Sequence, residues 1–166
     1  MKVIFKALLA AIILSGIAVC PLQANESIKK QKQPRMAVDF KLNDAKGNPV
    51  SSQDYIGKES LLLVFWTTWC PFCSQELQKL NQSYPELKKY GIEVLAVNIG
   101  EPVYRVENFL QRNNFSFKVL FDKDTVVARK FNVLGVPTFI LVNIKGMVVG
   151  EDIYFSEDKF KALLAQ

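Results

Sequence analysis

Unbroken and periodic runs of hydrophobic residues divide the chain into segments of strand and helix length. The run Leu61–Phe65 contains no polar residue and suits a strand that is buried on both faces of a sheet. The apolar residues that follow recur at helical spacing: Leu77, Leu80, Tyr84 and Leu87. This spacing predicts a helix, in which we expect Pro85 to cause a kink or an interruption near Tyr84.

The remaining patterns predict further strands and helices in alternation. We expect strands at 92–99, 115–121, 139–142 and 147–150, and helices at 103–110, 126–131 and 156–164, the last capped by Ser156. Before them, the turn-rich segment 43–48 between the segments 38–42 and 49–51 suggests a small hairpin. This order predicts an α/β sandwich with a mixed sheet, parallel in its βαβ part and antiparallel at the last hairpin.

The first 24 residues have the pattern of an export segment that is separate from the domain. Lys2 and Lys6 precede the apolar run Ala7–Val19, as the charged and apolar regions of a signal peptide do. Cleavage after Ala24, retention as an uncleaved membrane anchor and lipidation at Cys20 are three alternatives. All three predict a periplasmic or cell-envelope location, with membrane contact only through residues 1–24.

Residues 25–36 are polar and rich in lysine, which predicts a flexible tether before a domain at 37–166. The hydrophobic content of 49% is enough for one globular domain with a core. Removing residues 1–24 removes Lys2 and Lys6 but no acid, so the net charge falls from +5 to +3. A surplus this small and dispersed argues against a nucleic-acid partner, and we expect a monomer.

The use of cysteine and histidine excludes several classes of site. Beyond the export segment the cysteines are Cys70 and Cys73, and the chain has no histidine. Two cysteines alone cannot complete a usual structural zinc site, and hydrolase mechanisms that depend on histidine are excluded. Ser74 stands where c-type haem attachment needs a histidine. We therefore expect neither a metal nor another cofactor.

Cys70 and Cys73 form a C-x-x-C pair that follows the predicted strand Leu61–Phe65 and opens the predicted helix. At a helix N-terminus, free backbone N–H groups and the helix dipole favour negative charge, so a cysteine there is stabilised as a thiolate. The thiolate is the attacking species in disulfide exchange. Cys70 is therefore the candidate nucleophile, and Cys73, one turn behind it, can close a short disulfide.

Two segments together carry a family resemblance: Phe65–Cys73 (FWTTWCPFC) and Gly135–Phe139 (GVPTF). The chain resembles the thioredoxin superfamily and, within it, the extracytoplasmic TlpA/ResA-like thiol-disulfide oxidoreductases. The hairpin Val38–Ser51, the strand end Ala96–Glu101 and the helix Val103–Asn113 add to the closer match. The resemblance implies a thioredoxin-like fold, with a central mixed sheet flanked by helices, an N-terminal hairpin and an extra βα insertion.

The resemblance also implies that Val136–Pro137 is a cis peptide beside the cysteines, whereas the residues alone favour a trans turn proline. In this family the backbone at the position of Val136 pairs with an incoming peptide. Pro137 and the neighbours of the cysteines are therefore candidate substrate-binding residues, and these neighbours are Trp69, Pro71 and Phe72.

Glu76 is the candidate proton-transfer group. Thioredoxins have a buried aspartate six residues before the first cysteine, and Val64 stands there in this chain. Glu76 lies three residues after Cys73, on the same helical face, and matches a glutamate of ResA-like proteins. We expect it to assist proton transfer to and from the thiols. A solvated helix glutamate is the alternative.

The function that the resemblance implies is reduction or exchange of disulfides in exported proteins, with apocytochrome c as one candidate client. Cys70 would attack the substrate disulfide and Cys73 would resolve the mixed disulfide. A membrane thiol electron donor would then reduce the pair again. A disulfide-forming oxidase, which runs the same steps backwards, has the same sequence signature.

Three other interpretations are weaker. Thr67–Cys70 contains the T-x-x-C of peroxiredoxins, which suggests a thiol peroxidase, but Leu63 occupies the place of their motif proline. A copper chaperone of thioredoxin fold would bind Cu(I) through thiolates, but those proteins use C-x-x-x-C and histidine. A purely structural disulfide across so short a loop would constrain little of the unfolded chain.

Overall fold

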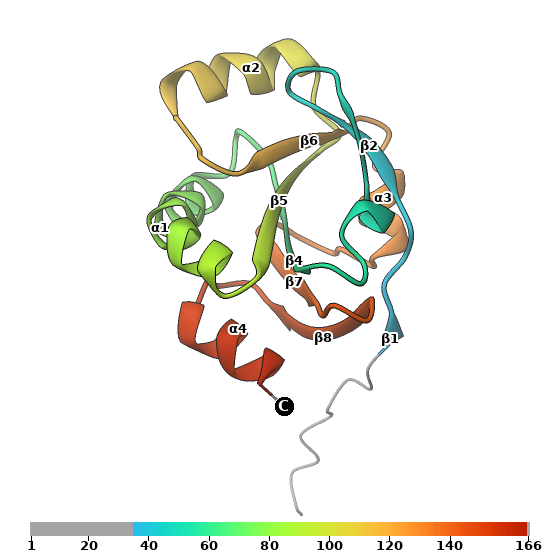
Figure 1. Cartoon of the computed structure of the whole chain (residues 1–166). Helices are drawn as coiled ribbons and strands as arrows, with labels where there is room; N and C mark the ends of the chain where they lie inside the picture. The colour runs from blue at the N-terminus through green and yellow to red at the C-terminus, as the bar shows by residue number, and fades with distance from the viewer. Residues whose placement is uncertain (1–34, 166) are drawn as a thin grey trace, which may run out of the picture. The chain divides into compact units, whose positions relative to one another are not determined.

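An eight-stranded mixed sheet runs through residues 35–165, the part of the chain that the computed structural model describes (Figure 1). Its strands are β1 (Arg35–Met36), β2 (Lys41–Asp44), β3 (Pro49–Ser51), β4 (Ser60–Trp66), β5 (Ile92–Ile99), β6 (Lys118–Asp122), β7 (Thr138–Val142) and β8 (Met147–Asp152). They lie in the order β1-β8-β7-β4-β5-β6-β2-β3. β4, β5 and β6 are parallel, and the other pairs are antiparallel. The expected α/β fold with a mixed sheet is confirmed.

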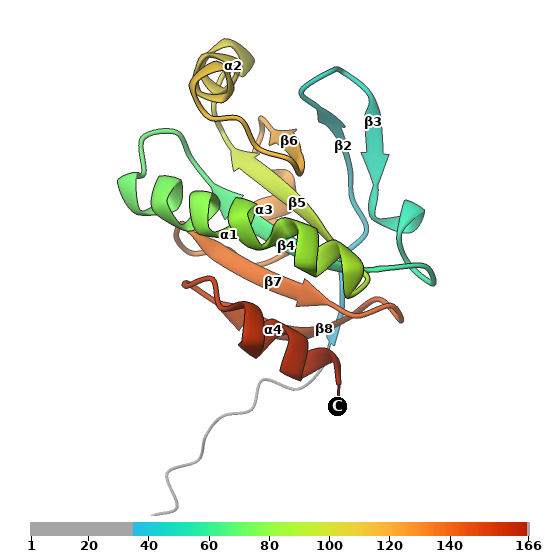
Figure 2. The same ribbon diagram turned by 60° about the vertical axis from the view of Figure 1, so that its left-hand side comes forward.

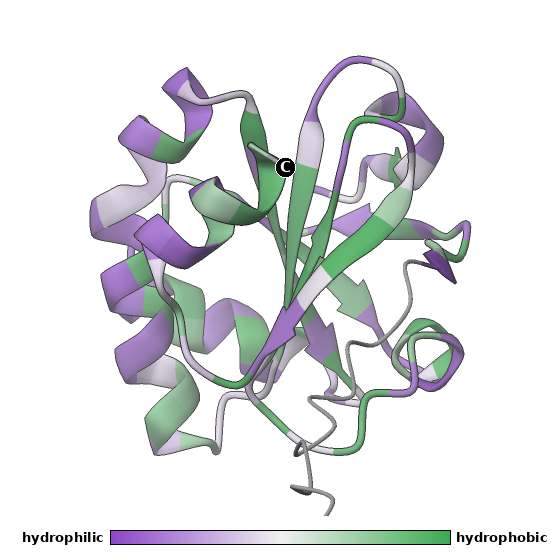
Figure 3. Cartoon of the chain, turned by 90° about the horizontal axis from the view of Figure 1, so that it is seen from below, coloured by the Kyte–Doolittle hydropathy of each residue, from purple (hydrophilic) through white to green (hydrophobic). Residues whose placement is uncertain are grey.

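The helices cover both faces of this sheet. They are α1 (Pro71–Lys89), α2 (Val103–Arg112), α3 (Val126–Lys130) and α4 (Glu157–Leu164), with a short 3-10 turn at Ser52–Asp54. Buried residues of α1, α2 and α4 share one core cluster, and α1 and α4 lie side by side over the sheet in Figure 2. Residues of α3 and the N-terminal hairpin share the second cluster on the other face. The strands are hydrophobic between helices that carry hydrophilic residues (Figure 3).

β4 is the central strand, and every one of its residues is buried. Side chains on a strand alternate between faces, so Val64 and Trp66 enter one core cluster while Leu63 and Phe65 enter the other. The prediction of a strand buried on both faces is therefore confirmed. Trp66 at the end of β4 pairs in register with Asn98 of the parallel β5. The loops after these two strands consequently start at the same edge of the sheet.

The sheet begins two residues earlier than predicted. Arg35 and Met36, expected to end the tether, form β1 and pair antiparallel with Val148 and Met147 of β8. An ion pair between Arg35 and Glu151 ties this start of the domain to the same strand. The predicted export segment 1–24 and residues 25–34 of the tether lie outside the described residues. Within 35–165, no helix has the length and the apolar character to cross a bilayer.

One predicted boundary was wrong, and one predicted cap lacks its side-chain hydrogen bond. β6 starts at Lys118 rather than at residue 115, because the Ser116 N–H donates to the Asn81 side chain on α1 and not to a neighbouring strand. The ring of Phe115 stacks on that of Phe117, with 5.1 Å between centroids, and packs into the core from outside the strand. Ser156 does occupy the N-cap of α4, but its side chain makes no capping hydrogen bond.

Pro85 does not interrupt α1, which continues through it to Lys89. Proline removes one backbone N–H donor, but the turn after Pro85 has its own tertiary contacts. Leu87 is fully buried in the core, and Lys88 forms ion pairs with Glu59 and Glu93. These contacts outweigh the loss of one helical hydrogen bond, so the prediction of an interruption was wrong.

Pro85→Ala should stabilise the domain by about 1 kcal/mol, because alanine restores the missing helical hydrogen bond at an exposed position. Part of this gain is offset because alanine leaves the unfolded chain more flexible. Urea unfolding would measure the difference. Gln82→Ala, at another exposed position of α1, is the control, because it keeps the backbone bonding unchanged. Equal stability of the two variants would contradict the prediction.

Candidate active site

Cys70 occupies the N-cap of α1, and Pro71 is the first residue of the helix. The backbone N–H of Cys73 points at the Cys70 sulfur, with 3.0 Å between N and Sγ. Cys70 has extended backbone angles, as an N-cap residue does. Its Sγ therefore lies against the free N–H groups of the first helical turn, where the helix dipole favours a negative charge.

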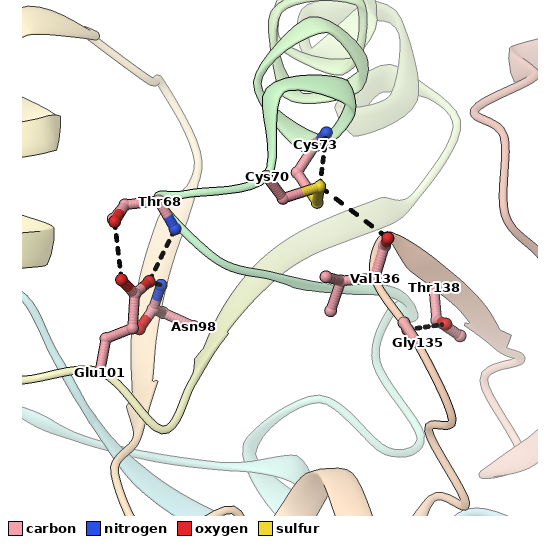
Figure 4. The surroundings of a disulfide bond; sticks show 8 residues. All are labelled: Thr68, Cys70, Cys73, Asn98, Glu101, Gly135, Val136 and Thr138. Carbon is pink, nitrogen blue, oxygen red and sulfur yellow. Dashed lines mark hydrogen bonds between the residues drawn. A yellow bond between two sulfur atoms is a disulfide. The ribbon is translucent and has the colours of Figure 1, made fainter.

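Cys70 and Cys73 are joined as a disulfide across the first turn of α1 (Figure 4). The two residues differ in accessibility, because Cys73 is fully buried whereas Cys70 keeps 8% of its surface exposed. A partner molecule can therefore reach the Cys70 sulfur but not that of Cys73. This asymmetry matches the expected order, in which Cys70 attacks and Cys73 resolves.

The segment before β7 lies directly opposite the disulfide. Val136–Pro137 is a cis peptide, as the resemblance implied. The carbonyl oxygen of Val136 is 3.8 Å from the Cys70 Sγ (Figure 4). Pro137 itself is buried behind this contact, so Val136 is the residue that faces the sulfur.

A groove of about 550 Å³ opens beside Cys70, and most of the predicted substrate-binding residues line it. They are Trp69, Pro71, Phe72 and Val136, whereas Pro137 is not part of the lining. The opposite wall comes from α3 and the segment after it, which contribute Ala128, Arg129, Val133 and Leu134. Trp69 is 66% exposed and Leu134 fully exposed, so the rim of the groove offers apolar surface to solvent.

Glu76 is buried, with 1% of its surface exposed, and the alternative of a solvated helix glutamate is therefore wrong. One carboxylate oxygen accepts a hydrogen bond from Lys79 Nζ at 2.6 Å, and the other accepts from the Phe155 backbone N–H at 2.7 Å. These partners, rather than the cysteines, are its hydrogen-bond donors within the described residues. Glu76 thereby ties the segment between β8 and α4 to the first turns of α1.

The same segment meets the C-x-x-C turn through a second contact. The ring of Tyr154 packs edge-on against that of Phe72, with 5.3 Å between centroids. Ile153 and Tyr154 are each more than half exposed. The surface around the disulfide therefore extends from the groove across Phe72 to the β8–α4 segment, a part of the site that the sequence analysis did not include.

Glu101 is a site residue that the sequence analysis missed. It is 6% exposed, and its carboxylate accepts hydrogen bonds from the Thr68 N–H, the Thr68 hydroxyl and the Asn98 side-chain amide (Figure 4). The sequence contained a pattern that could have identified Glu101. Thr68 and Glu101 are polar residues that follow adjacent parallel strands, and such residues meet at one edge of a sheet. Val64, at the position of the thioredoxin aspartate, is fully buried among apolar residues.

Comparisons with known proteins agree with this geometry. A model of the AhpC/TSA family matches residues 34–150. The thiol-disulfide oxidoreductase ResA of Geobacillus kaustophilus is 42% identical over 112 residues, which are 68% of this chain and 64% of that relative. The chain thus matches less than two thirds of that relative's length. The ResA of a Bacillus cereus strain is 31% identical over 142 residues, 84% of this chain and 82% of the relative.

A solved structure gives the same result for the fold. The protein assigned as thiol:disulfide interchange protein DsbE of Chlorobium tepidum is 31% identical, with a TM-score of 0.69. The alignment covers 77% of this chain and 89% of that one. The similarity thus extends over most of the described residues.

Glu76→Ala should destabilise the domain by about 2 kcal/mol, because it leaves the Phe155 N–H without its charged acceptor. Glu86→Ala is the matched control. Glu86 lies on the same helix and bonds Lys89 at the same spacing and the same 2.6 Å, but it is 55% exposed. An exposed pair of this kind contributes less than about 1 kcal/mol. Equal losses in urea unfolding would show that the buried bond to Phe155 adds nothing.

Proposed function

We propose, from the premise that this chain belongs to the AhpC/TSA family and to its ResA-like thiol-disulfide oxidoreductases, that it reduces disulfides of exported proteins through Cys70 and Cys73. The observation that carries the proposal is the position of the Cys70 sulfur. It lies at the N-terminus of α1, 3.0 Å from the Cys73 N–H, beside a groove that a peptide segment can enter. That environment favours the thiolate.

The reaction has two exchange steps. In the first, the Cys70 thiolate attacks one sulfur of the client disulfide. A bond forms between Cys70 and the client, the client disulfide breaks, and the released client thiolate takes a proton. In the second step, the Cys73 thiolate attacks Cys70 Sγ, the mixed disulfide breaks, and the second client thiol leaves. The client gains two electrons and two protons, and the pair becomes the disulfide that the structure contains.

Continued turnover needs a donor of two electrons. A membrane protein with its own dithiol would reduce the Cys70–Cys73 disulfide by the same two exchange steps. The direction of the reaction depends on the reduction potential of the pair. A potential near that of thioredoxin, about −270 mV, supports the reductase, whereas one near about −120 mV supports the disulfide-forming oxidase.

The groove supports recognition of an extended, apolar segment of the client. Trp69, Pro71 and Phe72 would contact its side chains, and the backbone of Val136, held by Pro137, would pair with its main chain. The Val136 carbonyl oxygen, 3.8 Å from the Cys70 sulfur, would bring the client disulfide within reach of the thiolate. Segments of exported proteins fit this description, and the haem-binding cysteines of apocytochrome c are one candidate.

The proposed location follows from the N-terminal sequence. The charged start and the apolar run after it have the pattern of an export signal, which supports a location of the domain in the periplasm or cell envelope. Residues 1–24 would be a signal peptide or a membrane anchor, followed by the predicted tether, of which Arg35 and Met36 form β1. The domain would then act as a monomer, in contact with the membrane only through that N-terminal segment.

Glu76 would serve the reaction as a buried base close to the helical turn of the cysteines. It is one helical turn from Cys73, and burial keeps bulk water away from it. Its ion pair with Lys79 reaches the surface, since Lys79 is 60% exposed. Lys79 would release one of its own protons to solvent and then take the proton that Glu76 has accepted from the Cys73 thiol.

Cys70→Ser should abolish reduction of insulin disulfides, because it removes the nucleophile. Cys73→Ser should instead accumulate mixed disulfides with client proteins, because the resolving thiol is lost. Non-reducing electrophoresis and mass spectrometry would detect these adducts. A Cys73→Ser protein without adducts, together with a Cys70 that resists alkylation in the reduced wild type, would contradict the assigned roles.

Glu76→Gln should slow disulfide exchange about a hundredfold and displace its pH dependence, because glutamine cannot take a proton. It keeps an acceptor for the Phe155 N–H, so the fold should be retained. Exchange rates between pH 5 and 9 would be compared with those of Glu86→Gln, the exposed glutamate on the same helix. If both variants follow the wild-type profile, Glu76 only positions the β8–α4 segment.

A further inference from the structure

Glu101 is the buried carboxylate nearest in structure to the loop that carries the nucleophile, and the reaction described above does not use it. It follows β5, whereas Thr68 follows the neighbouring strand β4 (Figure 4). Both hydrogen-bond donors of Thr68 end on this carboxylate, the N–H at 2.6 Å and the hydroxyl at 2.6 Å. Asn98 adds a third bond at 2.8 Å. These three residues are called the Glu101 clamp below.

The segment that the clamp holds is short and has few other bonds. Trp66 ends β4 and Cys70 is the N-cap of α1, so Thr67, Thr68 and Trp69 make the whole connection. The Cys70 N–H makes one long bond of 3.4 Å to the Thr67 carbonyl. Trp69, directly before Cys70, is 66% exposed, and it has no hydrogen bond to another residue within 35–165. The conformation of this connection therefore depends on Thr68 and Glu101.

A carboxylate suits this position because it offers two oxygens that only accept hydrogen bonds. The three donors of the Glu101 clamp satisfy it at short distances, as charge-assisted bonds do. A neutral amide has one acceptor oxygen, so it cannot accept all three bonds. Because the site is buried, a donor or acceptor left without a partner there would cost folding free energy.

We propose that Glu101 is a positioning residue of the active site, which fixes the Thr67–Trp69 connection and thereby holds the Cys70 sulfur against the N-terminus of α1. This inference rests on the proposed disulfide-exchange function and deepens it. With the clamp intact, Cys70 Sγ stays near the Cys73 N–H and near the Val136 carbonyl. Without it, the sulfur samples positions away from the helix N-terminus, the thiolate loses stabilisation, and fewer encounters lead to attack.

If Glu101 acted on Cys70 only through its negative charge, its neutralisation would change the pKa of the Cys70 thiol in the opposite direction to a loss of positioning. A nearby negative charge disfavours a thiolate, so neutralising it would lower the pKa of Cys70. Loss of positioning raises that pKa instead, because the helix N-terminus no longer stabilises the thiolate. The direction of the change in a neutral variant therefore separates positioning from simple charge repulsion.

The test is Glu101→Gln in the full-length, reduced protein, with Glu93→Gln as the matched control. Glu93 lies on β5 itself, near the opposite end from the site, and is 5% exposed. It also accepts three hydrogen bonds, from Tyr84, Lys88 and the Val94 N–H. Both variants replace a buried, triply bonded carboxylate, but only one of them touches the loop before Cys70.

Three quantities would be measured for each variant: the melting temperature, the pKa of Cys70 from thiolate absorbance, and the rate of insulin-disulfide reduction. We expect both variants to melt lower than the wild type. Only Glu101→Gln should raise the pKa of Cys70 and slow the reaction, by up to about a hundredfold, the cost that a misplacement of about 1 Å can reach. Glu93→Gln should keep the wild-type pKa and rate.

Two results would overturn the proposal. A Cys70 pKa in Glu101→Gln equal to that of the wild type would leave Glu101 only a structural role. A lowered Cys70 pKa would indicate that Glu101 acts by charge repulsion. If Glu101→Gln does not fold, Thr68→Val tests the same clamp, because it removes the hydroxyl donor with little change in volume. Thr68→Val should also raise the pKa of Cys70 and slow insulin-disulfide reduction, but both effects should be smaller than those expected for Glu101→Gln. The thiol titration needs no client, so a wild type that reduces no disulfide would refute the proposed function without deciding the role of Glu101.

Discussion

The contact between the Cys70 sulfur and the N-terminus of α1 is the interaction on which the rest of the site depends. It exists because β4 ends at Trp66 in the centre of the sheet and α1 starts five residues later. The helix packs on the sheet through fully buried residues such as Leu77 and Leu80, which fixes the direction of its N-terminus. The Cys73 N–H at that end then points at the sulfur, where the helix dipole favours a negative charge.

Buried carboxylates hold the segments that surround this contact. Glu101 binds Thr68 before the nucleophile, and Glu76 binds the Phe155 N–H beside Phe72. Asp122 does not line the groove, but it is completely buried and accepts from the Val127 and Ala128 N–H groups at the start of α3, the helix of the groove's opposite wall. Each carboxylate satisfies backbone donors that would otherwise be unpaired in the interior. The walls of the site are thus fixed by hydrogen bonds between elements, while the rim keeps exposed apolar side chains.

The accuracy of the sequence-based predictions depended on how local the deciding interaction was. The strand Leu61–Phe65 was predicted correctly because its apolar run has one stable place in an α/β sheet. Of the kink or interruption predicted at Pro85, the interruption was wrong, since the local cost of proline is outweighed by contacts that Leu87 and Lys88 make with distant residues. The spacing of Glu76 from Cys73 correctly indicated that both lie on one helix. The partner that bonds the buried Glu76 carboxylate, the Phe155 N–H, lies about eighty positions further along the chain.

By itself, the sequence determined the order of strands and helices, the C-x-x-C pair at the start of a helix, and the resemblance that led to the fold. These features depend on residues within one or two helical turns of each other, where spacing fixes geometry. Only the tertiary structure decided what lies around the pair. The Glu101 clamp, the Val136 carbonyl at the sulfur and the Tyr154 ring on Phe72 join residues 33, 66 and 82 positions apart. Such contacts follow from the register of parallel strands and the packing of the last helix, which no local pattern contains.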